Sequence, residues 1–180
     1  RWKREAMAQA WYPGETLSAG IGQGYMLATP MQLAVATSVM ASKGQRKVPR
    51  LLKAIDGEPV AAPLLEPLIA NDSNWASVYD GMREVVHGER GTAKKLAKGI
   101  QYEMGGKTGT AQVIGIAQNA VYNEDEVAER HRHHGLFIAF APLEAPTIAV
   151  AIIVENGGGS SAASPIARKV IDTWLLGEAS

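Results

Sequence analysis

Cysteine is absent from this chain of 180 residues. Without it the chain has neither a disulfide scaffold nor thiolate ligands for a structural zinc ion. The chain also has no formal net charge, because 18 Lys and Arg residues balance 18 Asp and Glu residues. This balance argues against a dedicated nucleic-acid-binding protein, whose affinity comes mainly from neutralising phosphates.

Long hydrophobic runs are also missing. The longest nearly unbroken apolar stretch, Ile148–Val154, is too short to cross a bilayer. No secretory signal peptide opens the sequence, which begins at Arg1 in a polar run instead of at a methionine. We therefore expect an internal start, as in a processed product or a nicked chain.

The sequence does contain enough apolar material for a core. Hydrophobic residues make up 46% of the chain, and the 19 glycines cluster where tight turns and close backbone approaches are expected. A length of 180 residues fits one domain better than two.

Two amphipathic helices are predicted in the first half of the chain. The first begins with Thr29 as N-cap, Pro30 in the first turn and Gln32 completing a capping box, and ends near Gly44. Its apolar face is expected to comprise Met31, Ala34, Val35, Ser38 and Val39. The second runs from near Ser73 to Gly88, with a buried stripe at helical spacing: Trp75, Val78, Tyr79, Met82, Val85 and Val86.

Strands are predicted in the second half. Threonine, valine and glycine residues from about Met104 onward favour a first strand. Residues 136–142 and 147–154 favour two more, joined by a tight connection. The last two strands should therefore form an antiparallel hairpin.

Two further helices complete the prediction. Thr92 is expected to cap a short helix through Leu96, and Ser164 and Pro165 to start a closing helix that Gly177 ends. Helices followed by three strands and a helix predict an α+β fold. A sheet this thin has edges that must be covered or paired, which fits a piece of a larger domain.

The sharpest motif is GGKTGT at residues 105–110. One interpretation is a phosphate-binding P-loop, which also ends in Gly-Lys-Thr. That loop needs an earlier glycine, where this chain has Gln101, and a helix after the threonine. The other interpretation is the K-T-G element of serine acyltransferases that react with β-lactams.

The residues after the lysine favour a strand, and so the second interpretation. On a strand, Lys107 and Gly109 share one face while Thr108 and Thr110 share the other. Strand twist and an edge facing a cleft can bring the lysine ammonium group and the hydroxyls toward one substrate. The glycine leaves room for a substrate backbone to approach.

The surroundings of this motif resemble the transpeptidase domain of class B penicillin-binding proteins, specifically the penicillin-binding protein 2 type of lateral wall elongation. The resemblance covers almost the whole chain. It is carried by GIGQGY at 20–25, TPMQLA at 29–34, GERGTA at 88–93, GKTGTAQ at 106–112, FIAFAP at 137–142 and VENGG at 154–158. It implies a penicillin-binding/β-lactamase-like fold with an antiparallel sheet and flanking helices.

Two sequence elements of that family are missing. The family uses S-x-x-K with the nucleophilic serine, then S-x-N or S-x-D, then K-T-G. No serine here has lysine three positions on, or Asn or Asp two positions on. We therefore expect residues 1–180 to be the C-terminal portion of one transpeptidase domain, inactive by itself.

The resemblance implies a role for each residue of the K-T-G strand. Lys107 would place positive charge near the active-site hydroxyls and the substrate carboxylate. Thr108 and Thr110 would hydrogen-bond the terminal carboxylate of a D-Ala-D-Ala stem peptide, and Gly109 would let its backbone approach. The Thr110 amide would be one of two oxyanion-hole donors, the other belonging to the absent serine. The strand edge would bind peptide by β-addition.

The implied reaction is peptidoglycan D,D-transpeptidation through an acyl-serine intermediate, inhibited by β-lactams. The implied partners are the upstream part of the same protein, stem peptides, and the membrane glycosyltransferase and scaffold proteins of the elongation machinery. No cofactor, metal or nucleic acid is expected. The implied location is the bacterial inner membrane, with this domain on the periplasmic side. A penicilloyl-serine sensor or inactive relative, which binds β-lactam without turnover, is the alternative.

Three histidines allow another chemistry. His131 and His133 are spaced to share a strand face and hold a metal ion, with His134 beside them. The neighbouring carboxylates include Glu124 and Asp125. We favour an exposed loop that becomes more positive below about pH 6.5.

Two other patterns are interpreted as structural. The glycines at 20, 22 and 24 lack the third glycine of a dinucleotide fingerprint, because Tyr25 follows, and we expect them to accommodate the backbone near the cleft. A basic run is expected to be a solvated loop and not an anion site: Lys43, Arg46, Lys47, Arg50 and Lys53.

Overall fold

The structure is a computed structural model that describes residues 1–114, 123 and 126–177. In chain order its elements are α1 (Trp2–Met7), α2 (Pro13–Gly20), α3 (Pro30–Ala41), β1 (Ala54–Ile55), β2 (Glu58–Pro59), α4 (Asp72–His87), η1 (Lys94–Ala97), β3 (Gly105–Ala111), η3 (Glu129–His131), β4 (His134–Ala141), β5 (Ile148–Val154) and α5 (Ser160–Leu176). Among the described residues, none of the helices combines the length and apolar character that a membrane span requires.

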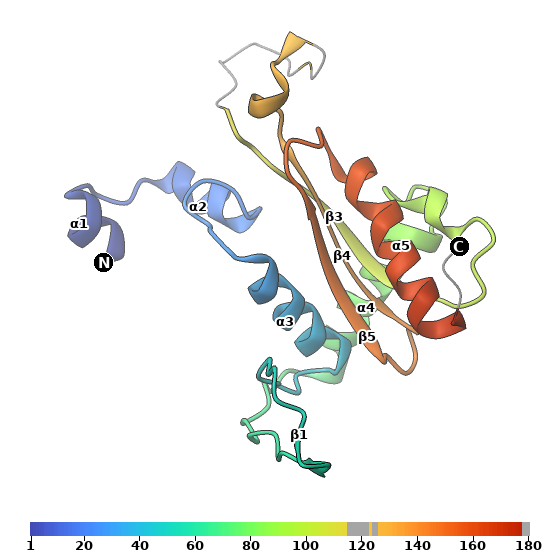
Figure 1. Ribbon diagram of the computed structural model, residues 1–180. Coiled ribbons are helices and arrows are strands. Elements are labelled where there is room, and N and C mark those ends of the chain that lie inside the picture. Colours follow the sequence, from blue (N-terminus) through green and yellow to red (C-terminus); the bar gives the residue numbers. More distant parts are fainter. Residues whose placement is uncertain (115–122, 124–125, 178–180) are drawn as a thin grey trace.

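β3, β4 and β5 form an antiparallel sheet in that order (Figure 1). Gly135 of β4 lies opposite Thr110 of β3 on one side and Val154 of β5 on the other. The predicted hairpin and the strand over the K-T-G motif are therefore confirmed. Within the described part of the chain β3 has a strand neighbour on one side only, so its other edge is open.

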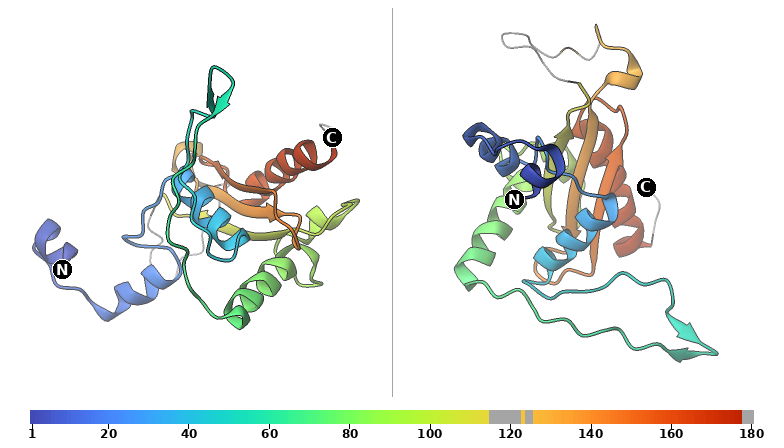
Figure 2. Two further views of the ribbon diagram at one scale, coloured as in Figure 1. Left: turned by 90° about the horizontal axis from the view of Figure 1, so that it is seen from below. Right: turned by 90° about the vertical axis from the view of Figure 1, so that its left-hand side faces the viewer.

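Alternation along the strands gives this sheet two apolar faces. Phe137 belongs to the core cluster that contains Ile171 of α5. Phe140, on the opposite face, packs with Ala41 of α3 and Met82 of α4. The right-hand view of Figure 2 shows α3, in light blue, in front of the sheet and α5, in red, behind it. Helices on both faces of an antiparallel sheet are the predicted α+β fold.

The start of α3 follows the sequence prediction. The Gln32 N–H donates to Thr29 Oγ1 at 3.2 Å, and the Thr29 N–H donates to Gln32 Oε1 at 2.8 Å. This reciprocal pair is the predicted capping box. It satisfies two backbone donors that a helix N-terminus otherwise leaves unpaired.

The predicted apolar face of α3 is confirmed in part, because four of its residues are half-buried: Ala34, Val35, Ser38 and Val39. Thr37 and Ala41 are its buried residues, whereas Met31 is 60% exposed. The C-terminal half of the helix packs on the sheet, where Ala41 joins the Phe140 cluster. The Thr37 hydroxyl tolerates burial because it donates to the Leu33 carbonyl oxygen at 2.7 Å.

α4 agrees with its prediction to within a residue. It runs from Asp72 to His87, and Met82 and Val86 of the predicted stripe are its buried residues. Gly88 follows it, as expected. A β-carbon at this glycine would lie 2.6 Å from the Glu84 carbonyl oxygen, so a larger residue does not fit here.

The predicted start of α5 is wrong. The helix begins at Ser160, directly after the glycines at 157–159, and Pro165 lies inside it. Pro165 lacks the N–H that would bond to the carbonyl four residues back, and its ring crowds that carbonyl, but burial of Ala163 in the core offsets this cost. The predicted end is confirmed, because Gly177 adopts the left-handed conformation with φ of 73°.

The predicted helix cap at Thr92 is also wrong. The short helix is η1, Lys94–Ala97, and Ala93 is the residue before it. The Thr92 hydroxyl instead lies 3.0 Å from the Thr108 hydroxyl of β3. A tertiary contact has replaced the local cap.

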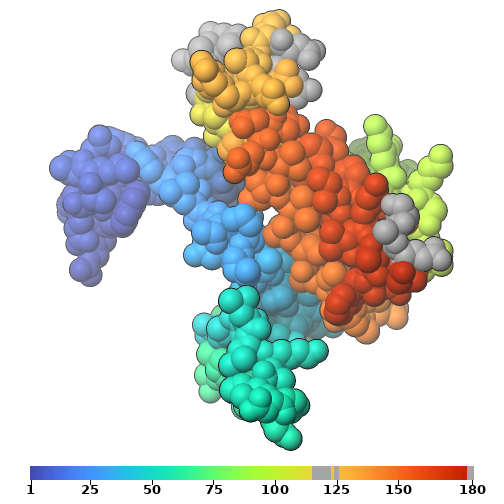
Figure 3. Space-filling view, in the orientation of Figure 1, coloured from blue at the N-terminus to red at the C-terminus, as the bar shows by residue number. Residues whose placement is uncertain are grey.

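Residues 1–28 and 43–70 project from the body of the molecule (Figure 3). The second is irregular, as expected, apart from the short pair of β1 and β2. The sequence of α1 and α2 shows little hydrophobic periodicity, so neither helix was predicted. An ion pair between Lys3 and Glu15 joins these two helices.

Candidate functional site

The K-T-G residues lie on β3, at the open edge of the sheet. Lys107 and Thr110 are exposed there, while Thr108 and Gly109 are half-buried. The strand continues to Ala111, so no helix follows the Lys-Thr pair. The P-loop interpretation is therefore wrong, because phosphate binding needs helix amides at that point.

The alternation of side chains along β3 is confirmed. A β-carbon at Gly106 would lie 2.6 Å from Phe137, on the face covered by α5. Gly109 is odd-numbered like Lys107, and a β-carbon there would lie 3.2 Å from Leu136, on the opposite face. Lys107 and Gly109 therefore share the face of α3 and α4, and the two threonines share the face of α5.

The open edge of β3 exposes backbone groups of Thr108 and Thr110. Lys107 Nζ donates to the Thr108 carbonyl oxygen at 2.7 Å. Gln23 Nε2 donates to the Thr110 carbonyl oxygen, also at 2.7 Å. In an antiparallel strand the N–H and C=O of one residue point to the same side. The amides of both threonines therefore face the open edge too, where a reacting carbonyl could approach them.

Gln23 is a residue of the site that the sequence analysis missed. It lies just after α2, between Gly22 and Gly24, whose φ angles are 76° and 68°. Its own N–H donates to the Ser18 carbonyl oxygen at 2.9 Å, which fixes its backbone at the end of α2. The paired glycines were the available signal, because glycine is the usual residue where the backbone takes a positive φ, as it does on both sides of Gln23.

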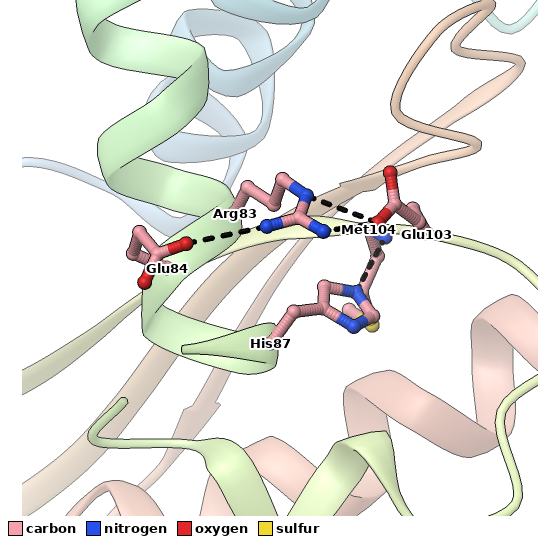
Figure 4. A network of polar contacts seen from close by, with 5 residues as sticks. All are labelled: Arg83, Glu84, His87, Glu103 and Met104. Carbon is pink, nitrogen blue, oxygen red and sulfur yellow. Dashed lines mark hydrogen bonds and ion pairs between the residues drawn. The ribbon is translucent and has the colours of Figure 1, made fainter. Parts of the chain in front are cut away.

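Residues of α4 bind the segment at the N-terminal end of β3 (Figure 4). The Met104 N–H donates to His87 Nε2 at 3.1 Å. Burial lowers the pKa of His87, which favours the neutral ring that this acceptor role needs. Arg83 pairs with Glu103 at 2.6 Å and lowers the pKa of that carboxyl.

The expectation of an exposed loop is wrong for His133 and His134, whereas His131 is exposed as expected. His133 is only 4% exposed, and its Nδ1 accepts from the Val113 N–H at 3.2 Å. His134 Nδ1 accepts from the Asn156 N–H at 2.9 Å. These rings therefore link backbone segments at the end of the sheet.

The metal interpretation gains no support from these contacts. His131 is exposed, and no group of three His, Cys, Asp or Glu residues in the described ranges could hold a metal ion. Glu124 and Asp125, named as neighbouring carboxylates, lie outside the described residues.

Comparison with known proteins identifies the family that shares this arrangement. Residues 3–172 match the penicillin binding protein transpeptidase domain. The peptidoglycan D,D-transpeptidase MrdA of Haemophilus influenzae is 42% identical over 180 residues, which cover 97% of this chain and 28% of that protein. The chain thus spans less than a third of that relative's length.

Two solved structures agree with the sequence match. The crystal structure of Pseudomonas aeruginosa PBP2 in complex with WCK 5153 has 47% identity and a TM-score of 0.82, covering 97% of this chain and 37% of that one. The complex between PBP2 and MreC from Helicobacter pylori has 32% identity and a TM-score of 0.77, and the match covers 98% of this chain and 30% of that one. By sequence and by fold, this chain belongs to the penicillin-binding protein transpeptidase domain family.

Proposed function

We propose that residues 1–180 are the C-terminal portion of one transpeptidase domain, in a peptidoglycan D,D-transpeptidase of cell elongation. The observation that carries the proposal is the open edge of β3. Lys107, Thr108 and Thr110 lie together there, and the backbone N–H and C=O groups of the two threonines are directed to the open side. An extended peptide can add to such an edge as a further strand.

Each residue has a role in this proposal. The ammonium group of Lys107 supplies positive charge beside the reacting hydroxyls. The hydroxyls of Thr108 and Thr110 bind the terminal carboxylate of a D-Ala-D-Ala stem peptide. The Thr110 N–H stabilises the oxyanion that forms when the scissile carbonyl is attacked. Gly109 leaves the substrate backbone room at the strand.

The nucleophile comes from a segment that carries S-x-x-K, since no serine of this chain has that pattern. The serine oxygen bonds to the carbonyl carbon of the penultimate D-alanine, and the terminal D-alanine leaves with the proton. The amine of a second stem peptide then attacks the acyl carbon and releases the serine hydroxyl. The new amide bond is the cross-link. β-Lactams block the first step by acylating the same oxygen.

The partners follow from the same proposal. The PBP2–MreC complex of Helicobacter pylori supports a scaffold partner of the elongation machinery for this chain. A membrane glycosyltransferase is the second protein partner we propose. We place the domain on the periplasmic side of the bacterial inner membrane, where peptidoglycan strands are joined.

Labelled penicillin and the full-length protein test the proposal. We expect one covalent adduct per molecule, located by mass spectrometry on a serine outside residues 1–180. An adduct on any serine within those residues would contradict it. Cross-linking of stem peptides by the same preparation separates the enzyme from a penicilloyl-serine sensor, which would acylate and produce no cross-link.

A further inference from the structure

Two glycines, Gly105 and Gly106, lie directly before Lys107 on β3. A β-carbon at the first would lie 2.9 Å from Phe140, and one at the second 2.6 Å from Phe137, so the strand backbone runs close over both rings. Neighbouring elements cannot hold this stretch by its side chains, because glycine has none. The position of Lys107 therefore depends on the pairing of β3 with β4 and on the residue that anchors the chain before the glycines.

That anchor is Met104. Backbone groups of an extended segment point alternately toward the neighbouring strand and away from it. The Glu103 carbonyl oxygen accepts from the Leu143 N–H at 2.9 Å, on the side of β4. The backbone groups of Met104 therefore face the open edge, as those of Thr108 and Thr110 do. The Met104 N–H needs an acceptor from an element other than β4.

α4 supplies this acceptor. His87 is the last residue of α4, and its Nε2 accepts from the Met104 N–H at 3.1 Å (Figure 4). Met104 is fully buried, so water is not at hand to replace the bond. The imidazole ring therefore takes the place that a neighbouring strand would occupy.

A second contact from α4 reaches the same segment and contributes less. Arg83 Nη2 pairs with Glu103 Oε1 at 2.6 Å, but the two side chains are 38% and 47% exposed. An ion pair in contact with solvent stabilises a protein little, whereas a buried N–H that loses its acceptor carries a full desolvation cost. The bond to His87 is therefore the contact from α4 that decides where this segment lies.

The acceptor role requires a neutral ring with its proton on Nδ1. Burial lowers the pKa of His87, and this effect outweighs the carboxylates of Glu103 and Glu84, which favour the charged ring. The guanidinium group of Arg83 acts in the same direction as burial. The ring is therefore neutral at pH 7 and is protonated only at a pH below its usual pKa of 6.5.

We infer that His87 is a positioning residue for the K-T-G strand, because its neutral ring fixes Met104 and thereby sets where Lys107 lies. Protonation turns the acceptor nitrogen into a donor. The Met104 N–H then loses its partner, and this end of β3 is released. Acylation should therefore slow at acidic pH through a residue that does not touch the substrate. The inference rests on the proposed function, since it takes β3 as a wall of the active site.

Two substitutions separate the hydrogen bond from the titrating ring. His87→Gln keeps an acceptor, the side-chain amide oxygen, and cannot be protonated in this range. His87→Leu keeps an apolar side chain and removes the acceptor. The measured quantity is the rate at which labelled penicillin acylates the full-length protein, between pH 7.5 and 5.0.

At pH 7.5 we expect His87→Leu to acylate about fivefold more slowly than the wild type, and His87→Gln to acylate at nearly the wild-type rate. As the pH falls, the rate of His87→Gln relative to the wild type should rise up to about fivefold, because only the wild type loses the bond. A ratio that stays constant down to pH 5.0 would overturn the release on protonation.

Ala76→Gly is the matched control, because this exposed residue of α4 weakens the helix without a contact to β3. It should lower the urea midpoint and leave the acylation rate unchanged. If it slows acylation as much as His87→Leu does, the effect of His87 is one of helix stability and the positioning role is wrong.

Failure of this inference differs from failure of the proposed function. If penicillin acylates the wild type and His87→Leu equally fast at pH 7.5, the positioning role is wrong and the proposed function stands. If penicillin acylates no serine of the wild-type protein, both fall. If urea unfolding shows that His87→Leu does not fold, the pH dependence of His87→Gln relative to the wild type decides the matter.

Discussion

The side-chain amide of Gln23 donates a 2.7 Å hydrogen bond to the backbone carbonyl oxygen of Thr110, 87 residues later in the chain. Within the described structure it is the one hydrogen bond that joins residues 1–28 to β3. The Gln23 side chain binds the Thr110 carbonyl oxygen, which points away from the sheet. It therefore holds the strand edge in place without blocking the Thr110 N–H. We therefore expect Gln23 to position the proposed oxyanion donor.

Removal of that hydrogen bond tests the role of Gln23. In the full-length protein, Gln23→Ala should slow penicillin acylation about fivefold, the effect of losing roughly 1 kcal/mol from one hydrogen bond. Gln9→Ala, at an exposed position of the same segment, should leave the rate unchanged. Equal rates for both variants would show that the strand edge needs no support from this segment.

Replacement of Lys107 tests the placement of the K-T-G strand beside the nucleophile. Lys107→Ala should slow acylation by about a hundredfold, the size seen when one preorganised electrostatic contact is removed from an active site. The melting temperature should change little, because this side chain is exposed and leaves no core cavity. Lys53→Ala is the control for an exposed lysine outside the site. A wild-type acylation rate for Lys107→Ala would refute the functional assignment.

The hydroxyls of Thr108 and Thr110 can be deleted without a change of shape. Thr108→Val and Thr110→Val should each reduce kcat/KM for acylation tenfold to a hundredfold, since a hydrogen bond to a carboxylate contributes about 1.5–3 kcal/mol. The Thr110 effect should lie at the lower end if its amide is the oxyanion donor, because valine keeps that amide.

Thr92 extends this series. Its hydroxyl lies 3.0 Å from that of Thr108, so it holds the latter in one orientation. Thr92→Val should raise KM for a peptide substrate about threefold with little change in kcat, the pattern of weakened binding and intact chemistry. A loss in kcat with unchanged KM would instead assign Thr92 to the chemical step.

Burial of His87 is expected to make the free energy of unfolding depend on pH. Burial keeps its pKa below the usual value of 6.5 in the folded protein, so the unfolded chain binds the proton more readily. The contribution of His87 to stability is therefore complete above about pH 6.5 and is lost as the pH falls toward the folded-state pKa. Urea unfolding at pH 7.5 and 5.5 should show a smaller decrease for His87→Gln than for the wild type.

The exposed His131 provides the matched control. His131→Gln should keep the wild-type decrease between the two pH values, because it leaves the buried His87 ring in place. Glu103, whose pKa Arg83 lowers, titrates at a more acidic pH and does not contribute in this window. An equal pH dependence for His87→Gln and the wild type would show that the buried ring does not resist protonation.

Local sequence signals determined much of the fold. The Thr29–Gln32 capping box sets the start of α3, and Gly88 and Gly177 follow the last turns of α4 and α5. The alternation along residues 105–111 predicts which side chains of β3 share a face. These features depend on neighbours within about four positions, so the sequence alone is enough to specify them.

Only the tertiary structure decided how distant segments meet. Pairing of Gln23 with Thr110, of Thr92 with Thr108, and of His133 with the Val113 amide joins parts of the chain that local propensity does not relate. Thr92 illustrates the reason: its hydroxyl could cap the next helix, but the sheet brings a better-placed partner within 3.0 Å. Packing against the sheet likewise begins α5 before Pro165, because burial there outweighs the lost hydrogen bond of one proline.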